Sequence, residues 1–206
     1  MKRKSRMFGF VTRTWNPRVG CDFNCVYCWA SRMARRMKHR CSKCYTFTPH
    51  AHPERLRTKF KPGELVFVCD MADIFTPSFQ PMDIRPVLSK ISMNRKTTFF
   101  IETKNPKRYM DFLDIMPGNV IISTTIETNR VYPKTVSKAP STRERFKAFA
   151  STPWDRKHVS IEPVMDFDLH ELTSMMARIE PEMVSIGYDN YGVLKKLGIP
   201  EPPPEK

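Results

Sequence analysis

The sequence alternates short apolar runs with longer amphipathic stretches, and this rhythm limits the fold more than any other feature. The apolar runs predict six strands, at residues 8–14, 65–69, 98–102, 120–125, 159–161 and 183–186. The stretches between them predict helices at residues 26–40, 83–94, 106–115, 141–149, 168–179 and 191–197. Continuously apolar strand runs are typical of a parallel sheet that helices cover. We therefore expect an α/β fold, a single partial (β/α)6 TIM-like barrel of parallel strands over residues 1–199, with a Pro-rich frayed tail over 200–206.

Local signals support two of the helix starts. Ser141 and Glu144 have the spacing of a capping box, and Asn105 places a capping amide before Pro106. The connection after the first helix, residues 38–63, is long, basic and contains Cys and His residues, which predicts a separate insertion. In barrels of this kind the chemistry gathers at the carboxyl ends of the strands.

The basic charge is concentrated at one end of the chain. The net charge is +14, and residues 1–61 account for all of it, with 16 Lys and Arg against two acidic residues. Such an asymmetry favours a polyanionic partner, a nucleic acid or nucleotide, although a solubilising surface or compensation for an anionic metal cluster would also use it. The side chains expected to contact phosphates are Arg32, Arg35, Arg36, Arg57, Lys59 and Lys61.

Targeting signals are weak in this sequence. No apolar run approaches the roughly 18 residues that cross a bilayer, and no apolar signal core follows the basic residues 2–4. We therefore expect a cytoplasmic location and no membrane partner. In a reducing compartment the six cysteines are more suited to metal binding or thiol chemistry than to disulfides.

The sharpest motif is the C-x3-C-x2-C triplet of Cys21, Cys25 and Cys28, directly after the first predicted strand. Three thiolates this close can hold one metal centre, and three are one short of a full set of four. A [4Fe–4S] cluster held in this way keeps one iron free for a small molecule. The alternative is a structural zinc knuckle.

A second group of metal-ligand residues lies in the insertion. Cys41, Cys44, His50 and His52 could form a Cys2His2 zinc site that fixes a segment with little core of its own, although the spacing differs from that of a standard zinc finger. Cys69 follows the second strand. It is either a buried small hydrophobe, a third ligand to this group or a weak candidate catalytic residue.

On these motifs the sequence resembles the radical S-adenosylmethionine (SAM) superfamily, whose signature is the cysteine triplet after the first strand of a partial (β/α)6 barrel. Weaker motifs resemble the spore photoproduct lyase-like branch and a phage-associated radical-SAM-like family of unassigned function. These motifs are WNPRVGC at 15–21, VFVCDMAD at 66–73, ETKNP at 102–106, STTIETN at 123–129, PSTRERF at 140–146 and SIEP at 160–163.

The resemblance implies a mechanism and a set of cofactors. SAM would bind the free iron of the [4Fe–4S] cluster, one electron would cleave it, and the 5′-deoxyadenosyl radical would abstract a hydrogen from the substrate. An electron donor such as flavodoxin or ferredoxin is then required. In this setting Cys69 could donate a hydrogen atom, as a cysteine does in some photoproduct lyases.

The resemblance also directs attention to polar residues at the strand ends as SAM contacts. Asp70 and Asp73, which replace the Gly-Gly-Glu of many relatives, would receive the methionine ammonium, and Lys104 would pair with the carboxylate. The remaining candidates are Tyr27 in the triplet, Ser123, Thr125 and Glu127 for the ribose, Glu162 for SAM or substrate, and Tyr188 near the adenine.

Two other functions are compatible with the sequence. One is a non-catalytic, zinc-dependent nucleic-acid-binding module, which would bind nucleic acid in a salt-dependent way without cleaving SAM. The other is a barrel that keeps its cluster and has lost catalysis, which the altered motif after the second strand keeps open.

Overall fold

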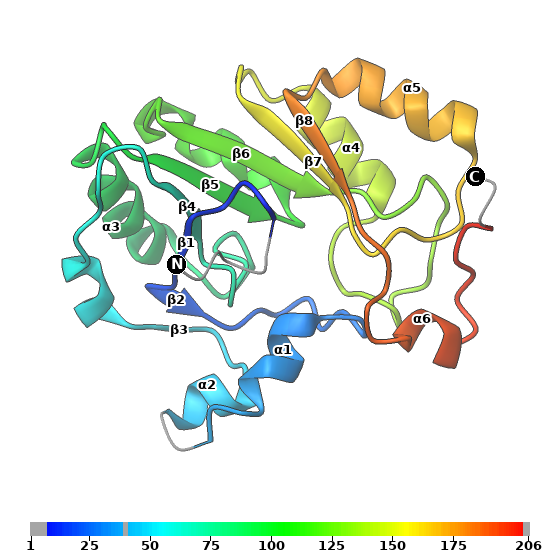
Figure 1. Ribbon diagram of the computed structural model, residues 1–206, viewed down its shortest axis with the longest axis horizontal. Coiled ribbons are helices and arrows are strands. Elements are labelled where there is room, and N and C mark those ends of the chain that lie inside the picture. The colour runs from blue at the N-terminus through cyan, green and yellow to red at the C-terminus, as the bar shows by residue number, and fades with distance from the viewer. Residues whose placement is uncertain (1–7, 39–40, 204–206) are drawn as a thin grey trace.

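Six parallel strands form the central sheet of the protein in a computed structural model that describes residues 8–38 and 41–203 (Figure 1). Their spatial order is β1-β4-β5-β6-β7-β8, so the strands of this sheet lie side by side in the order in which they occur along the chain. The strands are β1 (Arg13–Trp15), β4 (Leu65–Val68), β5 (Thr98–Thr103), β6 (Val120–Thr125), β7 (Lys157–Ile161) and β8 (Met183–Ile186). This arrangement confirms the predicted α/β fold and partial parallel barrel, in which β1 and β8 are the two open edges.

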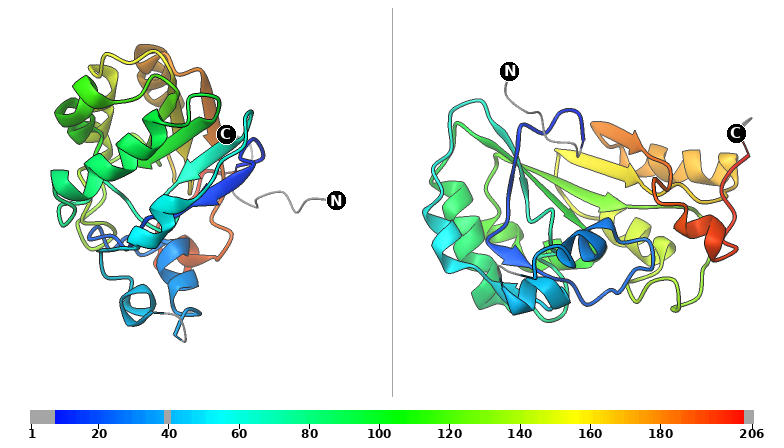
Figure 2. Two further views of the ribbon diagram at one scale, coloured as in Figure 1. Left: turned by 90° about the vertical axis from the view of Figure 1, so that its left-hand side faces the viewer. Right: turned by 60° about the horizontal axis from the view of Figure 1, so that its bottom comes forward.

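Helices follow the strands along the chain, and those between β4 and β8 cover the sheet (Figure 2). They are α1 (Trp29–Ala34), α3 (Pro81–Ser92), the 3-10 helix η2 (Pro106–Ile115), α4 (Thr142–Ala150), α5 (Leu169–Ile179) and α6 (Val193–Lys196). The largest core cluster joins apolar side chains of β4, β5 and β6 to those of α3, η2 and α4. Within the described residues, no helix is both long enough and apolar enough to cross a membrane.

The first strand and the first helix are shorter than predicted. Residues 8–12 do not belong to the strand, because the Val11 N–H bonds the Phe8 carbonyl and turns the chain. Helix α1 starts at Trp29 rather than at 26, because Cys28 has an extended backbone and its sulfur accepts the Ser31 N–H as the helix cap. The helix was predicted to extend to residue 40, but it ends at Ala34 and residues 35–38 are not helical. Residues 39–40 lie outside the described residues.

The segment before β1 fills the interior of the partial barrel with aromatic rings. Phe8 stacks on Phe10 at 5.2 Å and approaches Phe100 and His158 edge-on at 5.5 and 5.3 Å. Phe67 of β4 completes this aromatic cluster. The apolar run that predicted a longer first strand therefore serves as packing rather than as sheet.

The two predicted helix caps have different outcomes. Ser141 accepts the Glu144 N–H at 3.3 Å, and the Glu144 carboxylate accepts the Ser141 N–H at 2.7 Å, so the capping box is confirmed. The Asn105 amide instead donates to the Phe75 carbonyl at 3.1 Å, so its predicted capping role is wrong. The helix that follows Asn105 is 3-10 rather than α.

The region predicted as an insertion packs against the loop that precedes the cysteine triplet. It contains α2 (Ser42–Thr46), β3 (His50–Ala51) and the 3-10 helix η1 (Pro53–Arg57). Strand β3 pairs antiparallel with β2 (Arg18–Val19). At the other end of the chain, the Pro200 carbonyl accepts the Asp166 N–H at 2.9 Å, and residues 204–206 of the predicted frayed tail lie outside the described residues.

The capping box generates a stability prediction. Replacing Ser141 with Ala removes the side-chain acceptor at the start of α4, and we expect a loss of about 1 kcal/mol in the free energy of unfolding. Chemical denaturation measures it. Ser174→Ala is the matched control, because Ser174 is exposed inside α5 and should change stability by no more than a few tenths of a kcal/mol. Equal losses in the two variants would contradict the capping role.

Candidate functional site

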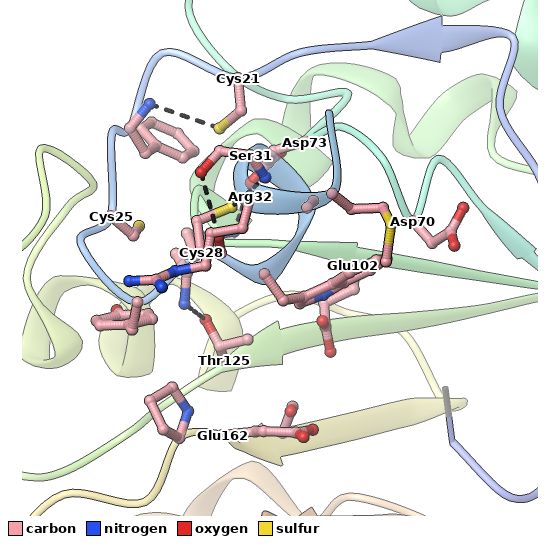
Figure 3. Close-up of a pocket in the computed structure, with 18 of the residues that line it drawn as sticks. Cys21, Cys25, Cys28, Ser31, Arg32, Asp70, Asp73, Glu102, Thr125 and Glu162 are labelled. Atoms are coloured by element: carbon pink, nitrogen blue, oxygen red, sulfur yellow. Dashed lines mark hydrogen bonds between the residues drawn. The ribbon is translucent and has the colours of Figure 1, made fainter. Parts of the chain in front are cut away.

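A cavity of about 1070 Å³ opens at the carboxyl ends of the strands, where the loops after β4, β5, β7 and β8 meet the loop of the cysteine triplet (Figure 3). Cys21, Cys25 and Cys28 line one side of it, and Asp70 and Glu162 line the opposite strand ends. The cavity therefore lies where the chemistry of parallel α/β folds gathers, as predicted.

The three cysteines are partly buried and carry hydrogen bonds from the chain. The Phe23 N–H donates to the Cys21 sulfur at 3.5 Å, and the Ser31 N–H donates to the Cys28 sulfur at 3.4 Å. The Cys25 sulfur lies 3.0 Å from the Ser137 hydroxyl. N–H groups directed at sulfur stabilise thiolate, the form in which cysteine ligates metal.

The ionisation of the triplet depends on a positive centre. Burial raises the pKa of Cys21, and the nearby Asp73 carboxylate and the other two thiols of the triplet raise it further. Burial also raises the pKa of Cys25, although the positive charge of Lys104 opposes this. The donor set therefore fits a metal centre, whose positive charge would compensate three adjacent thiolates.

Two aspartates follow β4 and have different partners. Asp73 is 7 % exposed and accepts three hydrogen bonds, from the Thr103 hydroxyl at 2.7 Å and from the backbone of Lys104 and Phe75 at 2.7 and 2.9 Å. Asp70 is less enclosed and is bonded to the Asn16 amide. Burial raises the pKa of both carboxyl groups. Asp73 thus fixes the loop after β5, whereas Asp70 is the more available of the two.

A buried charge cluster stands at the ends of β5 and β6. Glu127, 1 % exposed, is bonded to the Lys104 ammonium, to the Arg145 guanidinium at 2.7 Å and to the Tyr27 hydroxyl at 2.9 Å. Burial opposes ionisation of Glu127, but Arg145 and Lys104 outweigh it and hold its pKa well below the ordinary value. Lys104 also donates to the Thr125 hydroxyl at 2.7 Å. Lys104 is the member of this cluster that lines the cavity, whereas Glu127 and Arg145 are buried outside its lining.

A second buried polar group lies deeper in the barrel. The Ser123 hydroxyl donates to the Glu102 carboxylate at 3.0 Å and lies 2.8 Å from Nδ1 of His158. Nε2 of His158 lies 2.9 Å from the Ser185 hydroxyl. Burial raises the pKa of Glu102 to about 7 and lowers that of His158 to about 4. Glu102 lines the cavity, so a carboxyl group that titrates near neutrality faces it.

Glu162 owes its position to a glycine on the neighbouring strand. A Cβ atom at Gly187, directly after β8, would lie 2.6 Å from Oε1 of Glu162, so only glycine leaves room for this carboxylate. Burial raises the pKa of Glu162. Tyr188 follows at the rim of the cavity and is 63 % exposed, which suits a stacking surface.

Cys69 lines the same cavity and is 1 % exposed. Burial raises its pKa to about 12, so it stays a neutral thiol. The residue adopts a left-handed backbone conformation, with φ of 60°.

The predicted phosphate contacts are all exposed but do not form one surface. Arg32 of α1 and Arg35 directly after it line the cavity and are exposed, and Arg36 is the next residue. Arg57 lies at the end of η1, with Lys59 and Lys61 after it. This segment is at the left of the view in Figure 1, away from α1. The two groups are therefore separate.

The structure also brings Cys41, Cys44, His50 and His52 together. One ligand atom of each lies within 4.8 Å of the others, a grouping that could hold a metal ion. The group belongs to the insertion and does not line the cavity of the triplet.

The sequence reasoning assigned no role to Glu102, Arg145 or Gly187. Glu102 ends an apolar strand, where a carboxylate is unusual, and this signal could have identified it. Arg145 sits in the first turns of α4, and only its reach to Glu127 and the Thr125 carbonyl gives it a role. Gly187 acts through its missing side chain, which no pattern in the sequence indicates.

Comparison with known proteins places this geometry in context. The fold is similar to the solved structure of a mutant of spore photoproduct lyase, with a TM-score of 0.56 and 12% sequence identity. The likeness covers 87% of this chain and 55% of that one, so the present chain spans about half the length of its structural neighbour. No curated protein matches the sequence. Residues 6–180 match a protein family along most of the chain, and the protein therefore belongs to the family described as "Protein of unknown function (DUF5131)".

Proposed function

We propose that the protein is a radical SAM enzyme that holds a [4Fe–4S] cluster on Cys21, Cys25 and Cys28. The observation that carries this proposal is the position of three thiols on one loop, with N–H donors to two sulfurs, at the carboxyl end of a partial parallel barrel. The similarity of the fold to a spore photoproduct lyase supports it. When bound, the reduced cluster supplies an electron and SAM supplies the 5′-deoxyadenosyl group that abstracts hydrogen.

The residues around the cavity divide the task of holding SAM by charge. Lys104 lines the cavity and suits the methionine carboxylate, and its ion pair with Glu127 holds it in place. Asp70 and Glu162, at two other strand ends, present carboxylates to the methionine ammonium or to ribose hydroxyls. Tyr188 offers an exposed ring for the adenine.

We further propose a nucleotide or nucleic acid as the substrate. Arg32 and Arg35 are exposed at the cavity mouth, and Tyr191, 50 % exposed, lies under the Arg32 guanidinium at 5.7 Å. Cations beside exposed rings suit phosphates and unstacked bases. An electron donor such as flavodoxin or ferredoxin would complete the system. Lys59 and Lys61 do not line the cavity.

The alternative is a non-catalytic nucleic-acid-binding module that depends on zinc. The grouping of Cys41, Cys44, His50 and His52 favours it, because these four residues suit zinc without any help from the triplet. A barrel that binds a cluster and has lost catalysis is a third outcome, which SAM turnover would exclude.

The cluster proposal predicts about four iron and about four sulfide ions per chain after anaerobic reconstitution, the composition of the proposed cluster. Addition of reductant and SAM should then yield 5′-deoxyadenosine. The variant Cys21/Cys25/Cys28→Ala should lose iron and turnover while it keeps its fold, measured by circular dichroism. Cys69→Ala is the matched control and should keep its iron. A wild-type protein that binds only zinc at the triplet would refute the proposal.

The substrate proposal predicts salt-dependent binding at the cavity mouth. Each phosphate contact makes the slope of log K against log salt more negative by about 0.7 for a single strand, so Arg32→Ala with Arg35→Ala should make that slope less negative by about 1.4. Fluorescence anisotropy with a labelled single-stranded oligonucleotide measures this. Arg178→Ala, a change in α5 on a different element, is the control and should leave the slope unchanged. Equal slopes in wild type and the double variant would place the nucleic acid elsewhere.

The half-buried carboxyl group of Glu102 predicts a pH-dependent stability. Its pKa is raised from 4.5 to about 7, so the folded state prefers the protonated form and loses stability as pH rises between these two values. Glu102→Gln abolishes this loss. We expect its free energy of unfolding, relative to wild type, to be about 2 kcal/mol more favourable near pH 8 than near pH 5. Glu171→Gln on exposed α5 should show no such difference, and a flat profile for Glu102→Gln would show that Glu102 is solvated.

A further inference from the structure

We infer that Cys41, Cys44, His50 and His52 form a structural zinc site that holds the insertion against the loop carrying the cysteine triplet. Two short elements bring the four ligands together. Cys41 and Cys44 flank the first turn of α2, and His50 and His52 occupy alternate positions on and after β3, so both imidazoles face the same side.

The ligand atoms lie close to the separations of a tetrahedral site. Nε2 of His50 lies 3.6 Å from the Cys41 sulfur and 3.4 Å from the Cys44 sulfur. Nε2 of His52 lies 3.2 Å from the Cys44 sulfur and 2.9 Å from Nε2 of His50. Tetrahedral zinc with two sulfur and two nitrogen ligands places its donors about 3.3 to 3.8 Å apart. A small adjustment of the side chains would therefore accommodate the ion.

The other imidazole nitrogens determine the tautomers. Nδ1 of His50 lies 2.7 Å from the Thr48 carbonyl, which can only accept, so Nδ1 carries the proton. Nδ1 of His52 lies 3.0 Å from the Glu54 carboxylate and donates to it. Both Nε2 atoms are then lone-pair acceptors directed at each other across 2.9 Å. A cation between them turns this repulsion into coordination, and carbonyl and carboxylate groups are the usual hydrogen-bond partners of zinc-bound histidine.

The insertion needs such a fixed point. Among residues 41–57, Cys44 is the one buried side chain in this described segment. Helix α2 has five residues and β3 has two, which is too little apolar area to order the segment. Zinc is the fitting metal because it favours tetrahedral sulfur and nitrogen ligands and is redox-inert beside the proposed cluster.

The site is mechanically connected to the triplet. The Cys21 N–H donates to the Phe47 carbonyl at 3.4 Å, and Val19 pairs with His50. Gly20, with φ of +97°, lies so close that a Cβ atom would be 2.4 Å from the Thr48 carbonyl carbon. Cys41 and Cys44 also pack in the apolar cluster that contains Cys28. The zinc site thus supports the loop from both ends of the triplet.

The first test is metal content, and it does not depend on the iron–sulfur cluster. Protein purified in air, without reconstitution, should contain about one zinc per chain by elemental analysis, the stoichiometry of one four-ligand site. Cobalt substituted for zinc should give the visible bands of a tetrahedral thiolate site. Cys21/Cys25/Cys28→Ala should keep the zinc, whereas Cys41→Ser with Cys44→Ser should lose it. A wild-type protein that binds neither zinc nor cobalt overturns the inference.

A second variant guards against simple misfolding. Glu54→Gln keeps all four ligands and weakens only the hydrogen bond to His52, so zinc affinity should fall about 10-fold to 100-fold in a chelator competition. His170→Ala, an exposed histidine in α5, is the control and should keep the wild-type affinity. Unchanged affinity in Glu54→Gln would show that His52 does not ligate the ion.

A separate measurement tests whether the zinc site supports the triplet loop. The functional value of this support rests on the proposed function. Hydrogen exchange of the backbone amides of residues 18–23 should accelerate in the zinc-free protein, because the Cys21 N–H loses its fixed acceptor at Phe47. Exchange in α5 is the internal reference. If exchange accelerates but the protein binds no iron, the proposed cluster is refuted and the zinc site is not. If exchange is unchanged after zinc removal, the inference that zinc supports the triplet loop is refuted.

Discussion

One buried carboxylate joins the segments that build the cavity. Glu127 contacts Tyr27 from the cysteine loop, Lys104 from the end of β5 and Arg145 from α4. A charge that has left water is stable only while its partners stay in place, and removing one partner of a buried pair typically costs about 3–5 kcal/mol. The four segments, far apart in the sequence, therefore hold each other in position. The geometry of the triplet loop relative to the strand ends depends on this contact.

The central sheet could be predicted because burial on both faces leaves a direct mark in the sequence. Strands β4 to β7 are apolar runs that helices cover, and each is where the pattern placed it within a few residues. The first strand was misplaced because the same apolar signal is produced by Phe8 and Phe10, which pack inside the barrel without joining the sheet. Hydrophobicity indicates that a segment is buried, but only tertiary contacts decide whether it is buried as a strand of the sheet or as a packed loop.

The candidate site was predictable where it follows from topology. Parallel strands end on one side, so Asp70, Lys104 and Glu162 were expected together and all line the cavity. Arg145 and Gly187 were not identified. Arg145 acts through a contact with Glu127 on another segment, and Gly187 acts because it has no side chain next to Glu162. The first helix was expected, but both of its ends were misplaced, and its start depends on the Cys28 sulfur, which accepts the Ser31 N–H and caps the helix.

The aromatic rings inside the barrel set a limit to what can enter it. Phe8 and Phe67 line the cavity, and behind them Phe10, Phe100 and His158 occupy the space between the strands. These aromatic rings therefore close the bottom of the cavity. A large substrate would therefore stay outside the barrel and insert only one of its groups into the cavity. A bulkier side chain at Phe8 or Phe67 would limit how deeply any such group can enter.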